Sequence, residues 1–264
     1  MSGLWITARG MVWGTLLESI RRKDIYVLLI LSLALMGGTG LIRFFGVGGL
    51  EVFLKDISLT VINFFVLVLC VTATARQLPR EIEMRTIFPL LAKPMSRLEF
   101  LIGKYLGSLL LAILALALFA MEFSIIAKVA GADLGWIFVQ ALYLRILSLS
   151  VVVAMVLCLS LILTHGANVI ISLMLIFGAS LFSRSINLIY LNLNDTSPIT
   201  AKLLMWIYYL TPHFDLFDLS DKVVHSHAWN PVGFEIMALL TVYAAAYTTA
   251  LLIVAHLIFR RKSI

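Results

Sequence analysis

Charged residues are scarce in this chain of 264 residues. Only 13% of the residues are Asp, Glu, Lys or Arg, and 62% are hydrophobic, whereas a soluble domain usually carries about 25% charged residues. This composition excludes an ordinary soluble domain and predicts an integral membrane protein. The formal net charge of +6 is expected beside membrane spans. We therefore expect membrane lipids, and no nucleic acid, as partners of the basic residues.

Cysteine is nearly absent from the sequence. The chain has two, Cys70 and Cys158, and both stand inside apolar runs. Such isolated thiols imply no disulfide framework. A cleaved signal peptide is not expected either, because several charged residues at 18–23 precede the first apolar run.

Catalytic motifs are also missing. The Gly103-Lys104 pair is not part of a nucleotide-binding loop, because Tyr105 stands where Ser or Thr is needed and Leu98 where the first glycine belongs. The His-Glu-x-x-His pattern of zinc proteases does not occur. We therefore expect no catalytic residue, no cofactor bound by this chain and no enzyme, so that any energy from ATP must come through a partner.

Six apolar runs predict transmembrane helices, because about 20 apolar residues cross the hydrocarbon core. Helical spacing of apolar residues over 4–22 predicts a further helix lying in the membrane interface. The sequence thus predicts an all-α integral membrane fold, with a single transmembrane domain over 1–264. The expected spans are about 25–42, 57–75, 103–127, 146–164, 168–190 and 236–259.

The segments between the spans differ in character. A charged loop occupies 76–104, and a longer aromatic and acidic segment occupies 191–235. An interfacial piece is expected at 134–145, before the fourth span, and a tight turn at 165–168, after it.

Lys and Arg are unevenly distributed between the two sides of the predicted membrane. With the N-terminus inside, thirteen lie on the inner side and six on the outer side, while Arg145 stands at a boundary. Because basic residues accumulate in cytoplasmic loops, we expect both termini and the loop 76–104 in the cytoplasm. The segment 191–235 would then lie outside the inner membrane of the cell.

The first half of the charged loop carries a stop signal and a start signal for helices. Pro79 is expected to end the helix of the second span, because it lacks an N–H and crowds the preceding turn. A short helix is expected from Arg80, with Glu81 and Glu83 in its first turn, where negative charge suits the helix dipole.

The second half of the loop leads into the third span. Lys93-Pro94 predicts a break, and Ser96 with Glu99 forms a capping-box pattern before an apolar run. The third helix should therefore begin at Ser96. An ordered loop with charge of both signs is suited to docking a soluble partner. The alternative is a solvated loop whose basic residues only set the topology.

The stretch at 81–104 resembles the membrane subunit of type-2 ABC transporter permeases. Arg85 departs from that pattern, which usually has glycine before the threonine. The sequence at 209–219, YLTPHFDLFDL, is similar to the subgroup linked to multi-copper enzyme maturation. The matching residues are Glu81, Glu83, Thr86, Leu90, Leu91, Pro94, Ser96, Arg97, Gly103 and Lys104.

The resemblance implies an exporter in which two permeases work with two ATPase subunits. The second permease would be another copy of this chain, as a homodimer, or a related permease, and ATP and Mg would bind the ATPase. The pathway is expected between the two permeases, at the first, second and fifth spans. The residues expected to dock the ATPase, called the docking set below, are Arg80, Glu81, Glu83, Arg85, Thr86, Pro94, Ser96, Arg97 and Lys104.

Polar residues within the spans are candidates for a pathway, because ionisable groups in a membrane are costly. Asn63, Glu122 and Arg145 are the candidates. Glu122 and Arg145 are expected near the outer ends of their spans, where they could form a pair or extend their polar ends to the interface.

A metal site at His225 and His227 is a weak hypothesis, because no third ligand is defined and geometry diagnoses such sites. We therefore expect no metal.

Two other functions stay open at this point. One is a membrane-embedded maturation factor that uses the segment 191–235 as its site. The other is a scaffold that recruits a soluble partner through the loop 76–104 without transport.

Overall fold

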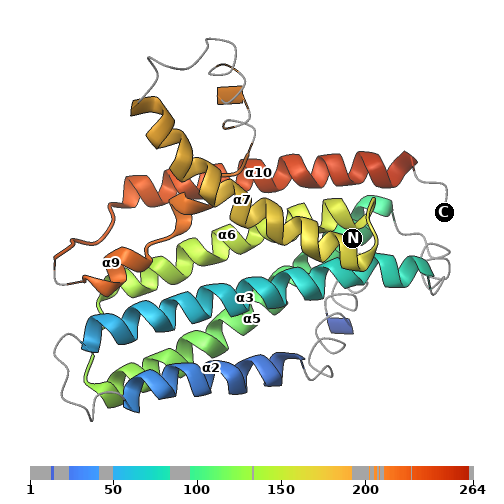
Figure 1. The fold of residues 1–264 in the computed structure, drawn as a ribbon. Helices are drawn as coiled ribbons and strands as arrows, with labels where there is room; N and C mark the ends of the chain where they lie inside the picture. The colour runs from blue at the N-terminus through green and yellow to red at the C-terminus, as the bar shows by residue number, and fades with distance from the viewer. Residues whose placement is uncertain are drawn as a thin grey trace.

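The computed structural model is built from helices, and no strand occurs among the residues that it describes (Figure 1). The expected interfacial helix at 4–22 falls almost entirely outside this description. So does the middle of the charged loop, at 84–95. The described residues are 13–14, 24–41, 50–83, 96–132, 134–191, 202, 205–206, 208, 211–226 and 228–261.

Six long helices and two short ones make up the described chain. Figure 1 shows α2, α3, α5, α6 and α10 running roughly along one direction. Their bounds are α2 Asp24–Leu41, α3 Leu50–Glu83, α5 Arg97–Ala130, α6 Trp136–Ser160, α7 His165–Leu191, η3 Phe214–Phe217, α9 Ser220–Val224 and α10 Phe234–Arg261.

Five of these helices are long and apolar enough to cross a membrane. A sixth apolar helix, Ile25–Gly38, is shorter. The all-α membrane fold predicted from the sequence is confirmed. The five are Glu51–Pro79, Arg97–Ala130, Trp136–Ser160, His165–Phe182 and Phe234–Arg261.

Pro79 lies inside α3, and the prediction that it ends the helix of the second span is wrong. The expected start of a separate short helix at Arg80 is also wrong, because α3 continues to Glu83. Proline removes the N–H that would bond the carbonyl of Ala75. Ala75 and Leu78 are fully buried. Packing against neighbouring helices therefore keeps this segment helical, as membrane helices with proline often are.

The region around the fourth span also differs from expectation. The interfacial piece at 134–145 is not separate, because α6 runs unbroken from Trp136 to Ser160. Gln140 exchanges two hydrogen bonds with the backbone of Val232, its Nε2 donating and its Oε1 accepting, both at 2.9 Å. The expected turn at 165–168 is the first turn of α7 instead. Polar side chains of α6 form hydrogen bonds with other elements, and the helix therefore continues through them.

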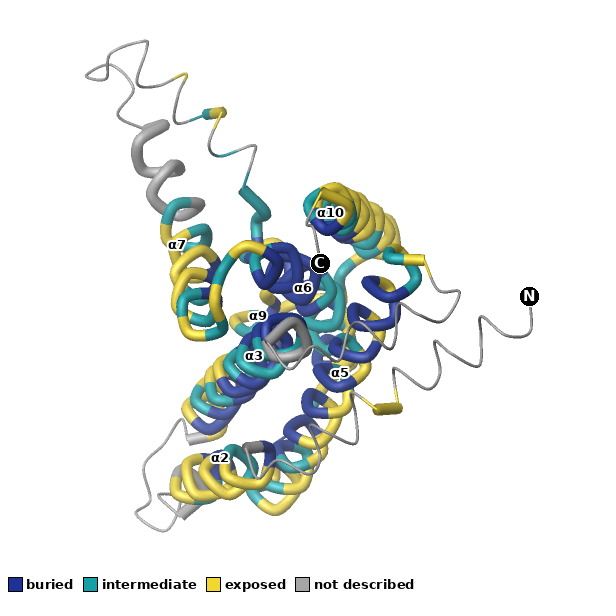
Figure 2. Tube along the Cα trace, turned by 90° about the vertical axis from the view of Figure 1, so that its right-hand side faces the viewer, coloured by how far each residue is buried: buried dark blue, intermediate teal, exposed yellow. Residues whose placement is uncertain are grey.

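The core is centred on α6, whose residues from Val151 to Leu157 are all buried. Figure 2 shows the buried residues gathered on α6 and on the facing sides of α3 and α5. In contrast, only 17% of the apolar window of α10 is buried, and 22% of that of α7. Those two helices therefore present apolar faces to lipid or to another chain, whereas α6 is enclosed by its own chain.

Candidate functional site

The capping box at the start of α5 is formed as predicted. The Oγ atom of Ser96 accepts a hydrogen bond from the backbone N–H of Glu99 at 3.2 Å. The Glu99 carboxylate accepts one from the backbone N–H of Ser96 at 3.0 Å. These reciprocal bonds satisfy two N–H groups that have no partner within the helix. The end of the charged loop is thereby joined to the first turn of α5.

Arg97, the first residue of α5, reaches the last turn of α10. Its Nη1 donates hydrogen bonds to the carbonyl oxygens of Phe259, at 2.8 Å, and Arg260, at 3.1 Å. Its guanidinium carbon lies 5.6 Å from the centre of the Phe259 ring. Carbonyls at a helix C-terminus lack intrahelical partners and attract positive charge. The sequence gives no signal for this contact, because the two ends are more than 160 residues apart.

Lys104 is also turned toward its own chain. It is buried, and its Nζ atom lies 5.8 Å from the centre of the Phe100 ring. The flexible methylene stem of lysine can pack among apolar groups, and the hydrophobic pattern of α5 alone does not show which face carries it.

Most of the docking set lies outside the described part of the structure. Arg80, Glu81 and Glu83 lie in the last turns of α3, and their side chains are outside the described part of the structure. Arg85, Thr86 and Pro94 fall outside the described residues altogether. Contact between the docking set and an ATPase therefore stays a prediction.

A polar network joins α3 and α6 to the segment 211–226. Arg145 donates from Nη2 to the backbone carbonyl of Asn63 at 2.5 Å. The side-chain amide of Asn63 donates to the hydroxyl of Ser220 at 3.0 Å. That hydroxyl in turn donates to the Asp218 carboxylate at 2.6 Å. Sequence reasoning named Asn63 and Arg145 but missed Asp218 and Ser220, because no local pattern links them to the spans.

The network borders a small cavity of about 20 Å³. Its walls combine the four polar residues with apolar side chains from α3, α5, α6 and η3. That volume holds about one water molecule. The Nε atom of Arg145 is buried without a hydrogen-bond partner, so a water in this cavity would satisfy it. The cavity is too small for a transported molecule larger than water.

Glu122 and Arg145 do not form the pair that the sequence suggested. The hydroxyl of Ser32, in α2, donates to Glu122 at 2.7 Å, while Arg145 binds the Asn63 carbonyl. Arg145 is the tenth residue of α6, and its guanidinium is turned toward α3 within the protein. The rotation of each helix about its own axis determines which neighbour a side chain meets. Glu122 faces α2, whereas Arg145 faces α3.

The Ser32 hydroxyl has one hydrogen but two close acceptors. Its Oγ atom lies 2.8 Å from the carbonyl oxygen of Leu29 and 2.7 Å from Oε2 of Glu122. A neutral Glu122 carboxyl could donate to Ser32 while Ser32 donates to Leu29, which would satisfy both contacts. A neutral carboxyl is also the less costly form within a membrane. We therefore expect Glu122 to be protonated.

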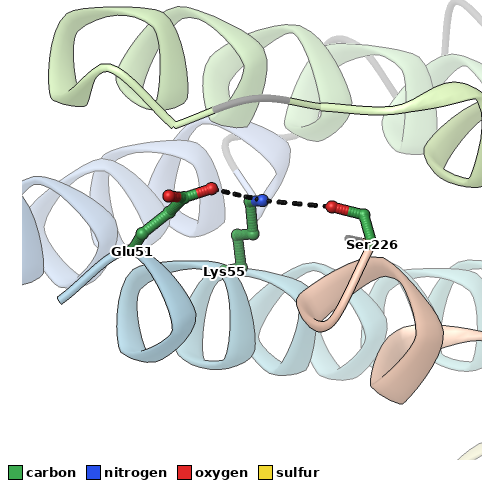
Figure 3. Close-up of polar contacts among 3 residues, drawn as sticks. All are labelled: Glu51, Lys55 and Ser226. Atoms are coloured by element: carbon green, nitrogen blue, oxygen red, sulfur yellow. Dashed lines mark hydrogen bonds and ion pairs between the residues drawn. The ribbon is translucent and has the colours of Figure 1, made fainter. Parts of the chain in front are cut away.

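A buried lysine lies near the start of α3 (Figure 3). The side chain of Lys55 is 1% exposed and its Nζ donates to Glu51 at 2.6 Å. It also donates to the hydroxyl of Ser226 at 3.5 Å. Figure 3 shows Ser226 reaching the lysine from the turn that follows α9. Sequence reasoning counted Lys55 only as a basic residue on the outer side. The structure shows that it ties α3 to the segment 211–226.

The same segment also binds α10. The backbone N–H of His213 donates to the hydroxyl oxygen of Tyr243 at 3.0 Å, and Nδ1 of the ring lies 3.0 Å from that oxygen. The ring packs edge-on against Tyr208, with centroids 4.1 Å apart. Burial lowers the pKa of His213, while the nearby charge of Asp215 opposes this shift. The neutral imidazole is therefore favoured.

The metal hypothesis gains no support from the structure. No group of three His, Cys, Asp or Glu residues that could hold a metal occurs among the described residues. His225 is exposed, and His227 lies outside the described part of the chain.

Comparison with known proteins matches the chain to one family model over nearly its whole length. That family is described as the ABC-2 family transporter protein, and it matches residues 12–264. No curated protein matches the chain. The family expected from the stretch at 81–104 is confirmed, while the copper-maturation subgroup stays a prediction. With its bundle of apolar helices and this match, the chain is a multi-pass membrane protein and belongs to the ABC-2 family of transporter proteins as a permease subunit.

Proposed function

We propose that the protein is the permease subunit of an exporter and pairs with a separate ATPase through residues 80–97 of the loop 76–104. The observation that carries the proposal is the capping box at Ser96, which joins the end of this loop to a long membrane helix. A force applied to the loop would therefore act directly on α5. Membership of the ABC-2 family supports an ATPase of the ABC class as the partner.

ATP and Mg would bind to that ATPase. This chain would bring only the docking loop and the membrane helices, and the absence of a nucleotide-binding loop from its sequence is consistent with that division. ATP binding would close the ATPase pair, and the helices would follow by rigid-body motion.

The arrangement of the helix ends supports the proposed topology. The contact of Arg97 with Phe259 places the start of α5 and the end of α10 at one end of the bundle. Arg260 and Arg261 lie in the last turn of α10. Basic residues therefore gather at the end that carries the loop, as expected for a cytoplasmic side. Both termini would lie in the cytoplasm, with the protein in the inner membrane.

A second permease would complete the transporter. The exposed apolar face of α7, the helix of the expected fifth span, would contact either a second copy of this chain, in a homodimer, or a related permease, while exposed apolar faces elsewhere would contact lipid. The transported molecule would pass between the two permeases, as the family resemblance implies, and the cavity at Arg145, which holds about one water, is too small to serve as its route.

Purification of the full-length protein from native membranes tests the proposal. We expect a soluble subunit with a nucleotide-binding loop to co-purify and to show ATPase activity. The double variant Glu81→Lys and Arg85→Glu should lose this association. Its matched control is Lys128→Glu with Glu235→Lys, which also exchanges one charge of each sign but at the opposite end of the bundle.

The results separate the alternatives. If no ATPase accompanies the wild-type protein, the exporter is wrong and the maturation factor becomes the better hypothesis. If a soluble partner without ATPase activity accompanies it through the loop, the protein is a scaffold. Unchanged association in the Glu81 and Arg85 double variant would show that the docking site lies elsewhere.

A further inference from the structure

Arg97 joins the first turn of α5 to the last turn of α10 by hydrogen bonds. The guanidinium binds two carbonyls there, at 2.8 and 3.1 Å. Beneath it, the rings of Phe100 and Phe259 stack with centroids 5.9 Å apart and planes 22° apart. Both phenylalanines are fully buried. Charged hydrogen bonds and an aromatic stack therefore join the two helix ends directly beside the capping box.

The middle of α10 is joined to the segment 211–226. The hydroxyl oxygen of Tyr243 accepts a hydrogen bond from the backbone N–H of His213. The hydroxyl of Tyr247 donates to the carbonyl of Thr211 at 3.4 Å. Tyr243 and Phe259 are separated by sixteen positions of one helix, which is about 24 Å at 1.5 Å per residue. A rigid second half of α10 therefore links the end of the bundle that carries Arg97 to the segment 211–226.

We propose that Arg97 is a positioning residue that makes α10 follow α5 when the charged loop is displaced. The inference rests on the proposed function, since it requires an ATPase that moves the loop. It assigns Arg97 a role inside the permease, whereas the docking set assigned it to the ATPase surface. The motion would then reach the segment 211–226 through α10, in addition to the direct contacts of that segment with α3 and α6.

Arginine suits this role better than lysine. Its planar guanidinium presents several N–H groups in a fixed fork and can serve two acceptors at once. The backbone carbonyls of Phe259 and Arg260, which follow one another in the chain, are the two acceptors here. A lysine would keep the charge near the end of α10 but would hold the two helices in a less defined arrangement.

The test measures distances in the assembled transporter in lipid nanodiscs, with the native cysteines replaced by alanine. Complexes are purified through a tag on the ATPase, so that only assembled transporters are measured. Spin labels at Val52 and Met121 report the motion of α5, and labels at Val52 and Ala238 report that of α10. All three positions are exposed. Distances are compared with and without ATP.

We expect both distances to change with ATP in the wild-type complex. In Arg97→Ala the α5 distance should still change, while the α10 change should be lost. Arg97→Lys should give a reduced α10 change. Arg261→Ala is the matched control, because it removes an exposed basic residue from the same last turn and should behave as the wild type.

An α10 change of wild-type size in Arg97→Ala would overturn the inference. So would failure of both Arg97 variants to assemble with the ATPase, since Arg97 would then be a docking residue. Two outcomes contradict the proposed function itself. In one, the wild-type complex forms but neither distance changes with ATP; in the other, the wild-type protein forms no complex with an ATPase.

Discussion

The guanidinium of Arg145, in α6, donates a hydrogen bond to the backbone carbonyl of Asn63, in α3. The side-chain amide of the same Asn63 donates to the hydroxyl of Ser220. These two hydrogen bonds, which share Asn63, connect two membrane helices and the segment 211–226. Hydrogen bonds to charged groups are stronger than neutral ones, and polar groups within the bundle have few other partners. The arrangement of this segment should therefore depend on Arg145.

Replacing Arg145 with methionine tests that dependence. Loss of the charged hydrogen bond should lower the free energy of unfolding by about 1.5–3 kcal/mol. Hydrogen exchange at 218–224 should become faster, because the network of Asn63 and Ser220 loses its bond to α6. Arg261→Met is the control, since Arg261 is exposed at the helix end. Unchanged exchange in Arg145→Met would mean that apolar packing alone holds the segment.

Removing the capping hydroxyl should loosen the start of α5. Ser96→Ala deletes the acceptor for the Glu99 N–H, and loss of an N-cap costs about 1 kcal/mol. Hydrogen exchange at 97–100 should accelerate while the middle of α5 is unaffected. Thr249→Ala serves as the control, because its hydroxyl binds carbonyls inside a helix and caps nothing. Equal effects of the two changes would contradict a specific role for the cap.

The buried Lys55 should depend on its carboxylate partner. Glu51→Gln leaves the ammonium group without a counter-charge, and we expect a loss of about 1–3 kcal/mol in the free energy of unfolding. The double change Glu51→Gln with Lys55→Met should be less costly than the single one, because no buried charge then remains. Thermal unfolding in nanodiscs gives the comparison. A double variant less stable than Glu51→Gln would show that Lys55 acts mainly through Ser226.

Glu122 should tolerate replacement by glutamine. The neutral carboxyl expected at Glu122 would donate to Ser32 across the 2.7 Å contact, and a glutamine amide can donate in the same place. We expect Glu122→Gln to change the free energy of unfolding by less than about 1 kcal/mol, within the net value of one hydrogen bond. Infrared spectroscopy should show a protonated carboxyl band that disappears in this variant. Presence of a carboxylate band in its place would contradict the assignment.

The attachment of the segment 211–226 to α10 should weaken in acid. Burial lowers the pKa of His213 in the folded protein from its ordinary value of 6.5. The unfolded state therefore binds more protons between these two values, and stability rises with pH in that window. The contribution is present above pH 6.5 and is lost as the pH falls through the lower, folded value.

Hydrogen exchange at 211–217 from about pH 8 to about pH 5 measures this effect, after correction for intrinsic exchange rates. The excess opening at low pH should be absent from His213→Gln. His225→Gln is the matched control, because His225 is exposed. If His213→Gln keeps the full pH dependence, another group is responsible.

The sequence by itself determined the class of the protein and the features that depend on near neighbours. Composition predicted a membrane protein, and apolar runs predicted the helices that the structure contains. The capping box was readable because Ser96 and Glu99 are three residues apart and their contacts form within one turn.

Only the tertiary structure decided which distant groups meet. Pro79 does not end α3, because surrounding helices hold that segment. Arg97 binds α10, and Arg145 binds α3 and not Glu122. For Arg97 and Arg145 the physical reason is the same: hydrophobic periodicity is weak in helices that are apolar on every side. It therefore leaves the rotation of each helix undefined, and rotation decides which neighbour receives a polar side chain.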